Sequence, residues 1–203
     1  MIAIIDYGMG NLFSLSSSLK SLGYEVEITA DPDRLRAADK LFLPGVGAFR
    51  DAQERLFSTG LADVIRELAA EGKPLMGICL GMQLLFDKSY EYGEYEGLGL
   101  IPGNVVPMEG SIAPELKIPQ MGWNALIRKR SHPLLKDVKE GDCVYFVHSF
   151  YAADCDDSLV ATTEYGKELT ALVAKDNVMG CQFHPEKSGN VGLKILRAFS
   201  AMT

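Results

Sequence analysis

The sequence lacks any long apolar run, and no stretch approaches the ~20 apolar residues that a membrane-spanning helix needs. Its start, 1–6, has no basic segment or cleavage site of a signal peptide and instead predicts a first strand. Clustered Lys and Arg are also scarce. The net charge of −7 argues against sequence-independent binding of nucleic acids, and we interpret Arg128-Lys129-Arg130 as a solvated turn. We therefore expect a cytoplasmic protein without membrane or nucleic-acid partners.

Cysteine is sparse as well. The four cysteines form no CxxC pair and have no zinc-site spacing, so we expect reduced thiols, no bound metal and no cofactor. Any cysteine with a special role must have it as a single thiol. The 203 residues fit one domain, 1–203, which can bury roughly 70% of its extended surface without a disulfide or metal.

Apolar runs alternate with amphipathic stretches in the first half of the chain. We expect strands at 2–6, 24–29, 40–43 and 74–78, a helix at 11–22 capped by Asn11, and a helix at 51–71 with a break near Gly60. This alternation is typical of an α/β protein whose parallel sheet is covered by helices on both faces.

The second half is β-rich. We expect short strands at 99–108, 123–127, 143–151, 159–163, 169–175 and 178–183, the last two joined as a hairpin at Asp176-Asn177. A helix at about 190–202 closes the chain. The segment 89–97 is rich in Tyr, Glu and Gly and is interpreted as a mobile surface loop.

A weak motif follows the first strand. Gly8-Met9-Gly10 has the setting of a dinucleotide-binding turn, but Phe13 occupies the place of the third glycine. We interpret it as a tight turn between strand and helix.

The most informative stretch is Gly77-Ile78-Cys79-Leu80-Gly81, between an apolar strand and a predicted helix. This is the nucleophile-elbow pattern, with Cys where many hydrolases carry Ser. A nucleophile projecting from so sharp a turn needs small neighbours on both sides. The helix N-terminus favours a thiolate, and the Leu80 N–H can face a developing oxyanion. The other cysteines are expected to be ordinary thiols: Cys143 and Cys181 in apolar strands, and Cys155 in an acidic loop that disfavours its thiolate.

A thiol nucleophile needs a base, and the chain has three histidines, His132, His148 and His184. Only His184 has an acid placed to orient it. Residues i and i+2 of an extended segment point the same way, so Glu186 is expected to bond to His184. A glycine-rich loop after another strand, 44–47, can supply a second oxyanion donor or can be a plain turn.

Together, Gly77–Gln83 and His184-Pro185-Glu186 resemble the class I (triad) glutamine amidotransferases. More narrowly, the chain is similar to the family of glutaminase subunits of imidazole glycerol phosphate synthases, in blocks that cover nearly its whole length: 5–12, 44–49, 119–124, 145–151 and 182–188. One departure is Phe150, where Tyr is more usual.

The resemblance implies a flavodoxin-like sheet and a heterodimer with a (β/α)8 barrel cyclase, which receives ammonia for histidine biosynthesis. The glutaminase would be a hydrolase that forms part of a lyase complex. Its implied catalytic residues are Cys79, His184 and Glu186; its oxyanion and substrate contacts are Gly45, Val46, Gly47, Leu80, Gln83, Ser149 and Phe150; its partner contacts are Asn11, Met121, Trp123 and Lys187.

Three alternatives stay open on the sequence. The chain could serve another amidotransferase, it could be a non-catalytic scaffold of the same fold, or it could be a cysteine protease-like hydrolase. We also expect that the 44–47 loop of the isolated chain turns a carbonyl toward the oxyanion position until a partner binds.

Overall fold

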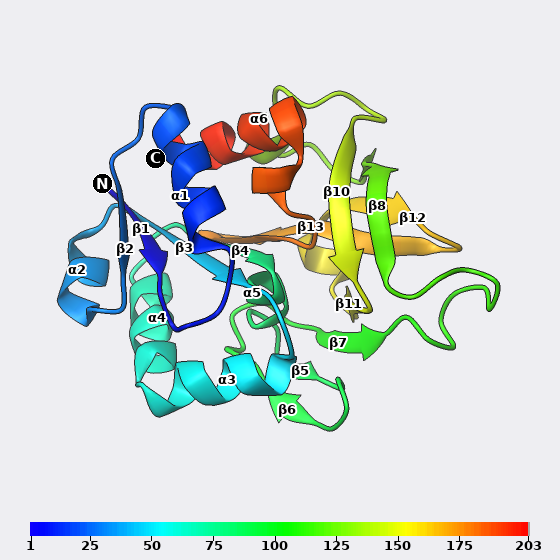
Figure 1. Cartoon of the computed structure of the whole chain (residues 1–203), viewed down its shortest axis with the longest axis horizontal. Helices are drawn as coiled ribbons and strands as arrows, with labels where there is room; N and C mark the ends of the chain where they lie inside the picture. Colours follow the sequence, from blue (N-terminus) through cyan, green and yellow to red (C-terminus); the bar gives the residue numbers. More distant parts are fainter. Residues whose placement is uncertain (203) are drawn as a thin grey trace.

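The computed structural model describes residues 1–202, and its centre is an eight-stranded sheet of order β2-β1-β3-β4-β14-β13-β12-β9 (Figure 1). Five adjacent strands are parallel: β2 (Val26–Thr29), β1 (Ile2–Ile5), β3 (Lys40–Gly45), β4 (Leu75–Cys79) and β14 (Val178–Cys181). The other three are antiparallel: β13 (Glu168–Lys175), β12 (Leu159–Glu164) and β9 (Ile127–Arg128).

Helices cover both faces of this sheet, as the alternation in the first half predicted (Figure 1). One face carries α1 (Leu12–Ser21) and α6 (Gly189–Ser200), and the other carries α2 (Pro32–Ala37), α3 (Phe49–Ser58) and α4 (Leu61–Ala70). Successive strand residues point to opposite faces. Ile2 and Ile4 therefore pack with α1 and α6, whereas Ala3 and Ile5 pack with α3 and α4. The expected α/β fold is confirmed.

Two small sheets lie beside the main one, and together with β9, β12, β13 and β14 of the main sheet they account for the β-rich second half. One pairs β8 (Gln120–Ala125) with β10 (Cys143–His148). The other has the order β11-β7-β5-β6, with β11 (Phe150–Ala153), β7 (Asn104–Pro107), β5 (Lys88–Ser89) and β6 (Tyr95–Glu96). The remaining short elements are α5 (Leu80–Gln83) and the 3₁₀ turns η1 (Pro133–Leu135), η2 (Asp156–Ser158) and η3 (Pro185–Lys187). No helix among residues 1–202 is both long and apolar enough to cross a membrane.

Several sequence expectations about elements hold, and others are wrong. The break at Gly60 and the hairpin at Asp176-Asn177 are confirmed. The strand expected to stop at Leu43 continues to Gly45, because it pairs with β4 as far as Cys79. Asn11 occupies the N-cap position of α1, but its side chain makes no capping hydrogen bond. Helix α2 was not predicted, although its start is a capped Asp31-Pro32 pair.

The structure adds detail to three expectations about surface features. The 89–97 segment is mostly an exposed loop, as expected, closed by the short β5–β6 pair; its Glu91 carboxylate accepts from the Phe49 N–H of α3, and its mobility stays a prediction. Cys143 is exposed at the start of β10. Arg130 is exposed in a bend, as expected, and its guanidinium also donates to the carbonyls of Asp157, Ser158 and Ala174.

Candidate functional site

Three neighbouring parallel strands deliver the candidate residues to one edge of the main sheet. Within β3, β4 and β14, Gly45 is in register with Cys79, and Ile78 is in register with Cys181. The carboxyl ends of parallel strands share one edge, and ligand sites of open α/β sheets form there. The glycine-rich loop after β3, the thiol at the end of β4 and the histidine segment after β14 therefore meet.

The elbow at Cys79 is strained and depends on both flanking glycines. Cys79 has φ 54° and ψ −114°, a conformation that non-glycine residues rarely adopt and that often marks a functional site. A Cβ on Gly81 would lie 1.7 Å from the Leu43 carbonyl oxygen, and one on Gly77 would lie 2.6 Å from the Gly81 oxygen. The glycines let the single turn α5 sit directly against β3 and β4, and that contact aims the thiol.

The thiol opens into a cavity of about 330 Å³, within the range of small-molecule pockets. Cys79 is only 8% exposed, and its Sγ accepts from the Gln182 amide at 3.7 Å. The cavity brings together most of the residues expected around a substrate: Val46, Gly47, Cys79, Leu80, Gln83, Ser149, Phe150 and His184.

His184 is held by Glu186 and by its own backbone. Its Nδ1 donates to Glu186 Oε1 at 2.8 Å, and both side chains are 2% exposed. The expected contact exists, but its predicted geometry was wrong, because Glu186 reaches back through the 3₁₀ turn η3 and not along an extended strand. The His184 backbone N–H donates to Tyr145, and Ser188 donates to the His184 carbonyl.

The three histidines differ in protonation. Burial alone would lower the pKa of His184, but Cys79 and Glu186 outweigh it and raise the pKa from 6.5 to about 10. Burial lowers the pKa of His148 to about 4, and burial with the nearby Arg130 lowers the pKa of His132. Only His184 shares the cavity with a thiol and has a carboxylate partner. A cysteine, an imidazole and a carboxylate in this order can carry out nucleophilic acyl transfer.

The 44–47 loop is anchored from beneath. The buried Tyr7 hydroxyl donates to the Pro44 carbonyl at 2.7 Å, and burial raises the pKa of that hydroxyl. A Cβ on Gly45 would lie 2.7 Å from this hydroxyl and 2.8 Å from the Gly81 nitrogen. The turn at Gly8-Met9-Gly10 packs against the same loop, with Gly10 facing Pro44. The set-aside glycine motif is thus a tight turn that supports the site.

The opposite wall of the cavity is made by Gln83 and the β10–β11 connection. The Gln83 amide nitrogen donates at 3.1 Å to the Phe150 carbonyl and at 3.1 Å to Gln182 Oε1. These bonds tie α5 to the Ser149–Phe150 backbone. The substitution of Phe for the more usual Tyr leaves this contact intact, because it uses a backbone carbonyl.

Sequence reasoning missed Glu91 and Tyr92, which line the same cavity from the tip of the β5–β6 hairpin. Glu91 accepts from the Phe49 N–H at 3.2 Å, and partial burial raises the pKa of its carboxyl. No sequence signal distinguishes Glu91 from Glu94 or Glu96 in the same acidic segment. Only the folded hairpin shows that Glu91, and neither of the other two glutamates, lines the cavity.

Candidate partner contacts lie at the surface. Met121 is 65% and Trp123 56% exposed, on the side of β8 opposite to the buried Gln120, and Lys187 is exposed while Asn11 is half-buried. Phe13, which the sequence reading did not select, is 80% exposed near the start of α1. Large apolar side chains left in solvent are typical of interaction surfaces.

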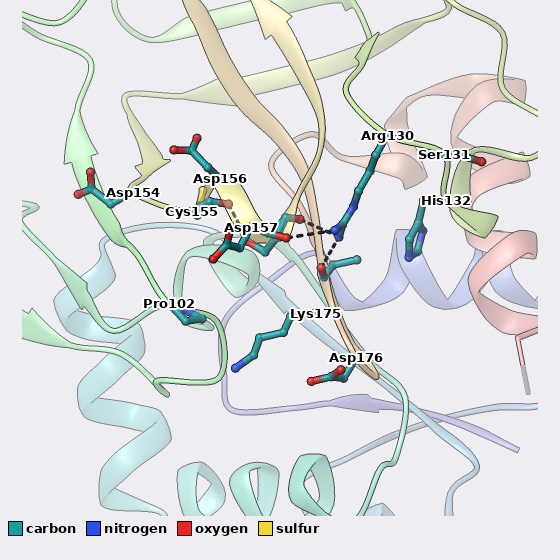
Figure 2. A pocket seen from close by; sticks show the side chains of 12 residues that line it. Pro102, Arg130, Ser131, His132, Asp154, Cys155, Asp156, Asp157, Lys175 and Asp176 are labelled. Atoms are coloured by element: carbon teal, nitrogen blue, oxygen red, sulfur yellow. Dashed lines mark hydrogen bonds between the residues drawn. The ribbon is translucent and has the colours of Figure 1, made fainter.

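A second, larger cavity of about 830 Å³ shares no lining residue with the first. It lies between the segments 130–132, 154–158 and 174–176 (Figure 2). Figure 2 shows the Arg130 guanidinium directed at backbone carbonyls, with Asp154, Asp156, Lys175 and Asp176 around the opening. Its one cysteine, Cys155, is a buried thiol with a raised pKa, mainly because of burial and secondarily because of the acids that the sequence had indicated. Acidic side chains, Arg130 and Lys175 surround this cavity, and its one thiol, Cys155, contacts the Thr170 hydroxyl and not a base.

Comparison with known proteins agrees with this geometry. The family model described as glutamine amidotransferase class-I matches residues 3–201. The chain is 53% identical to a protein named imidazole glycerol phosphate synthase subunit HisH from Caldanaerobacter subterraneus subsp. tengcongensis, over 100% of this chain and 98% of that one. It is also 53% identical to the protein of that name from Geobacillus sp. (strain WCH70), over 100% and 97%.

Solved structures share the fold at low sequence identity. A structure described as a glutamine amidotransferase superposes with a TM-score of 0.76 at 19% identity, covering 99% of this chain and 100% of that one. The structure of PurLQS from Thermotoga maritima gives 0.75 at 21%, covering 98% and 96%.

Proposed function

The chain belongs to the class I glutamine amidotransferase family, and we propose that it is the glutaminase subunit of an imidazole glycerol phosphate synthase. It hydrolyses glutamine to glutamate and ammonia and works with a partner subunit in histidine biosynthesis. The observation that carries the glutaminase activity is the buried Cys79, His184 and Glu186 set at the carboxyl ends of two neighbouring strands, and the 53% identity to two HisH proteins supports the choice of synthase.

In the first half of the proposed reaction, the Cys79 thiolate attacks the side-chain carbonyl carbon of glutamine. The oxyanion is held by the Leu80 N–H and by a second N–H from the Gly45–Gly47 loop. His184, protonated in the resting site, gives its proton to the departing nitrogen, and ammonia leaves. A thioester between Cys79 and the glutamyl group remains.

In the second half, neutral His184 takes a proton from water, which attacks the thioester. The C–S bond then breaks, Cys79 leaves as thiolate and His184 keeps the proton taken from water, which restores the thiolate and imidazolium pair; glutamate is released and its new carboxyl group gives its proton to solvent. Glu186 accepts from Nδ1 throughout, so that Nε2 stays directed at the sulfur and at the leaving group.

Substrate binding is proposed for the remaining cavity wall. Gln83 and the Ser149–Phe150 backbone would contact the glutamine, and the half-buried Glu91 carboxylate would pair with its α-ammonium group. Because Glu91 stands at a hairpin tip and Cys79 at a strand end, binding of one glutamine would require both elements in place.

The partner is proposed to be a (β/α)8 barrel cyclase that forms a heterodimer with this chain. Asn11, Met121, Trp123 and Lys187 are proposed contacts, and the exposed Phe13 of α1 is proposed as a further apolar contact. We expect partner binding to turn an N–H of the 44–47 loop into the oxyanion site. Losing one such donor costs roughly 10²–10³ in rate, so the free chain should be slower by at least that factor.

The decisive experiment measures glutamate release from glutamine by the purified chain, alone and with the cyclase subunit of the same organism. Glutamine hydrolysis that the partner stimulates, with no hydrolysis of peptides, is the expected result. Hydrolysis of peptides in place of glutamine, or no glutamine hydrolysis even in the complex, contradicts the proposal.

A further inference from the structure

His148 has no role in the proposed reaction, yet it is buried in the wall of the glutamine cavity and held at both ring nitrogens. It lies on β10 directly opposite Gln120 of β8. Its Nδ1 is 2.8 Å from the Phe150 carbonyl oxygen, and its Nε2 is 2.8 Å from Gln120 Oε1. A histidine fixed so completely beside a substrate site has a defined protonation state.

The two contacts determine where the proton lies. A backbone carbonyl can only accept, so Nδ1 must carry a hydrogen. Burial lowers the pKa of His148 to about 4 although the Phe150 carbonyl opposes this, so the ring holds a single proton at neutral pH. Nε2 is then an acceptor and needs a donor. The Gln120 amide nitrogen is buried without a partner among residues 1–202, and a half-turn of the amide places it on Nε2.

The Phe150 carbonyl also connects His148 to the nucleophile. It accepts from Gln83 at 3.1 Å, Gln83 donates to Gln182 at 3.1 Å, and Gln182 donates to Cys79 Sγ at 3.7 Å. The position of one carbonyl therefore fixes two amide side chains that line or reach the cavity.

We infer that His148 is a positioning residue for glutamine binding: its Nδ1–H, with Nε2 held by the Gln120 amide, sets the Phe150 carbonyl that orients Gln83 and the Ser149–Phe150 wall. The inference rests on the proposed function, because its effect is on the binding of glutamine. It also places Gln120, on the buried side of β8, in the same network as the site.

Two matched substitutions test the contributions of the two ring nitrogens of His148 one at a time. His148→Asn keeps an amide nitrogen near the position of Nδ1 and retains the bond to Phe150. His148→Gln keeps one near the position of Nε2 and loses that bond. In the complex with the partner subunit, we expect KM for glutamine to rise at least about tenfold more in H148Q than in H148N, as for the loss of one buried hydrogen bond, with a smaller change in kcat.

A measurement on the wild-type chain needs no substitution of His148. In ¹⁵N-labelled protein at neutral pH, long-range ¹H–¹⁵N NMR should show one neutral histidine with its proton on Nδ1. His132→Gln identifies the signals of His132, and Glu186→Gln shifts those of His184. His132→Gln also serves as the kinetic control, with the KM of the wild type.

The outcomes distinguish the positioning role of His148 from the proposed glutaminase function. Equal KM values for H148N and H148Q, both folded by their melting curves, overturn the positioning role. So does an imidazolium or an Nε2–H tautomer at His148 near neutral pH. If the wild-type complex hydrolyses no glutamine, the proposed function fails, while the NMR measurement still decides the arrangement of His148 and Gln120.

Discussion

Acidification should destabilise this protein through His148, and the amount can be worked from the structure. The pKa of His148 is about 4 in the folded chain, whereas an unfolded histidine has its ordinary value of 6.5. The folded pKa is the lower one, so the unfolded chain takes up the proton first. The stabilising contribution is complete above about pH 6.5 and is lost as the pH falls toward about 4. At about 1.4 kcal/mol for each pH unit, the loss is about 3 kcal/mol.

The assay compares urea unfolding of the wild type and of His148→Gln across this pH window. Carboxylates and His184 titrate in both proteins, so the difference reports mainly the titration of His148, to which the nearby His184 charge contributes. The variant, which lacks the buried hydrogen bond of the ring, should be the less stable protein at about pH 8, and the gap should close or reverse by about 3 kcal/mol as the pH falls to about 4. His132→Gln is the control and should show a smaller change, since His132 is only half-buried. A gap between wild type and H148Q that stays constant across the window would refute the reasoning.

Four further predictions concern the site. Cys79→Ala and Cys79→Ser should abolish glutamine-dependent synthesis by the complex but spare synthesis from free ammonia; glutaminase activity retained in Cys79→Ala excludes the assigned nucleophile. His184→Ala should lower kcat by several orders of magnitude, and Glu186→Gln by less, in steady-state assays; greater damage from His148→Ala in a folded protein would contradict the triad. Gly192→Ala, whose Cβ would lie 1.9 Å from the Pro185 carbonyl, should cost about 1–3 kcal/mol in urea unfolding and lower kcat by displacing His184, whereas Asn190→Ala on the exposed side of α6 should do neither. Glu91→Gln should raise KM for glutamine roughly tenfold or more, with kcat less affected; an unchanged KM would remove Glu91 from the substrate site.

The local sequence was sufficient for those parts of the site that are built from one short segment. The Gly77–Gly81 elbow could be predicted because the requirement for small neighbours acts within five residues. The pairing of His184 with Glu186 is likewise local, although the chain achieves it through a 3₁₀ turn that the sequence reading did not foresee. The alternation of apolar runs determined the layered α/β fold for the same reason: it is a repeating local pattern.

The tertiary structure alone decided which distant groups meet. Tyr7 and Gly10 support the 44–47 loop only because β1 and β3 are neighbours in the sheet. Glu91 enters the cavity because a hairpin folds over it, and nothing in its local sequence separates it from two nearby glutamates. His148 and Gln120 are 28 residues apart and become a bonded pair through the register of β8 and β10. Local patterns follow from the geometry of a few consecutive residues, whereas these contacts depend on strand order, register and burial, which the whole chain determines.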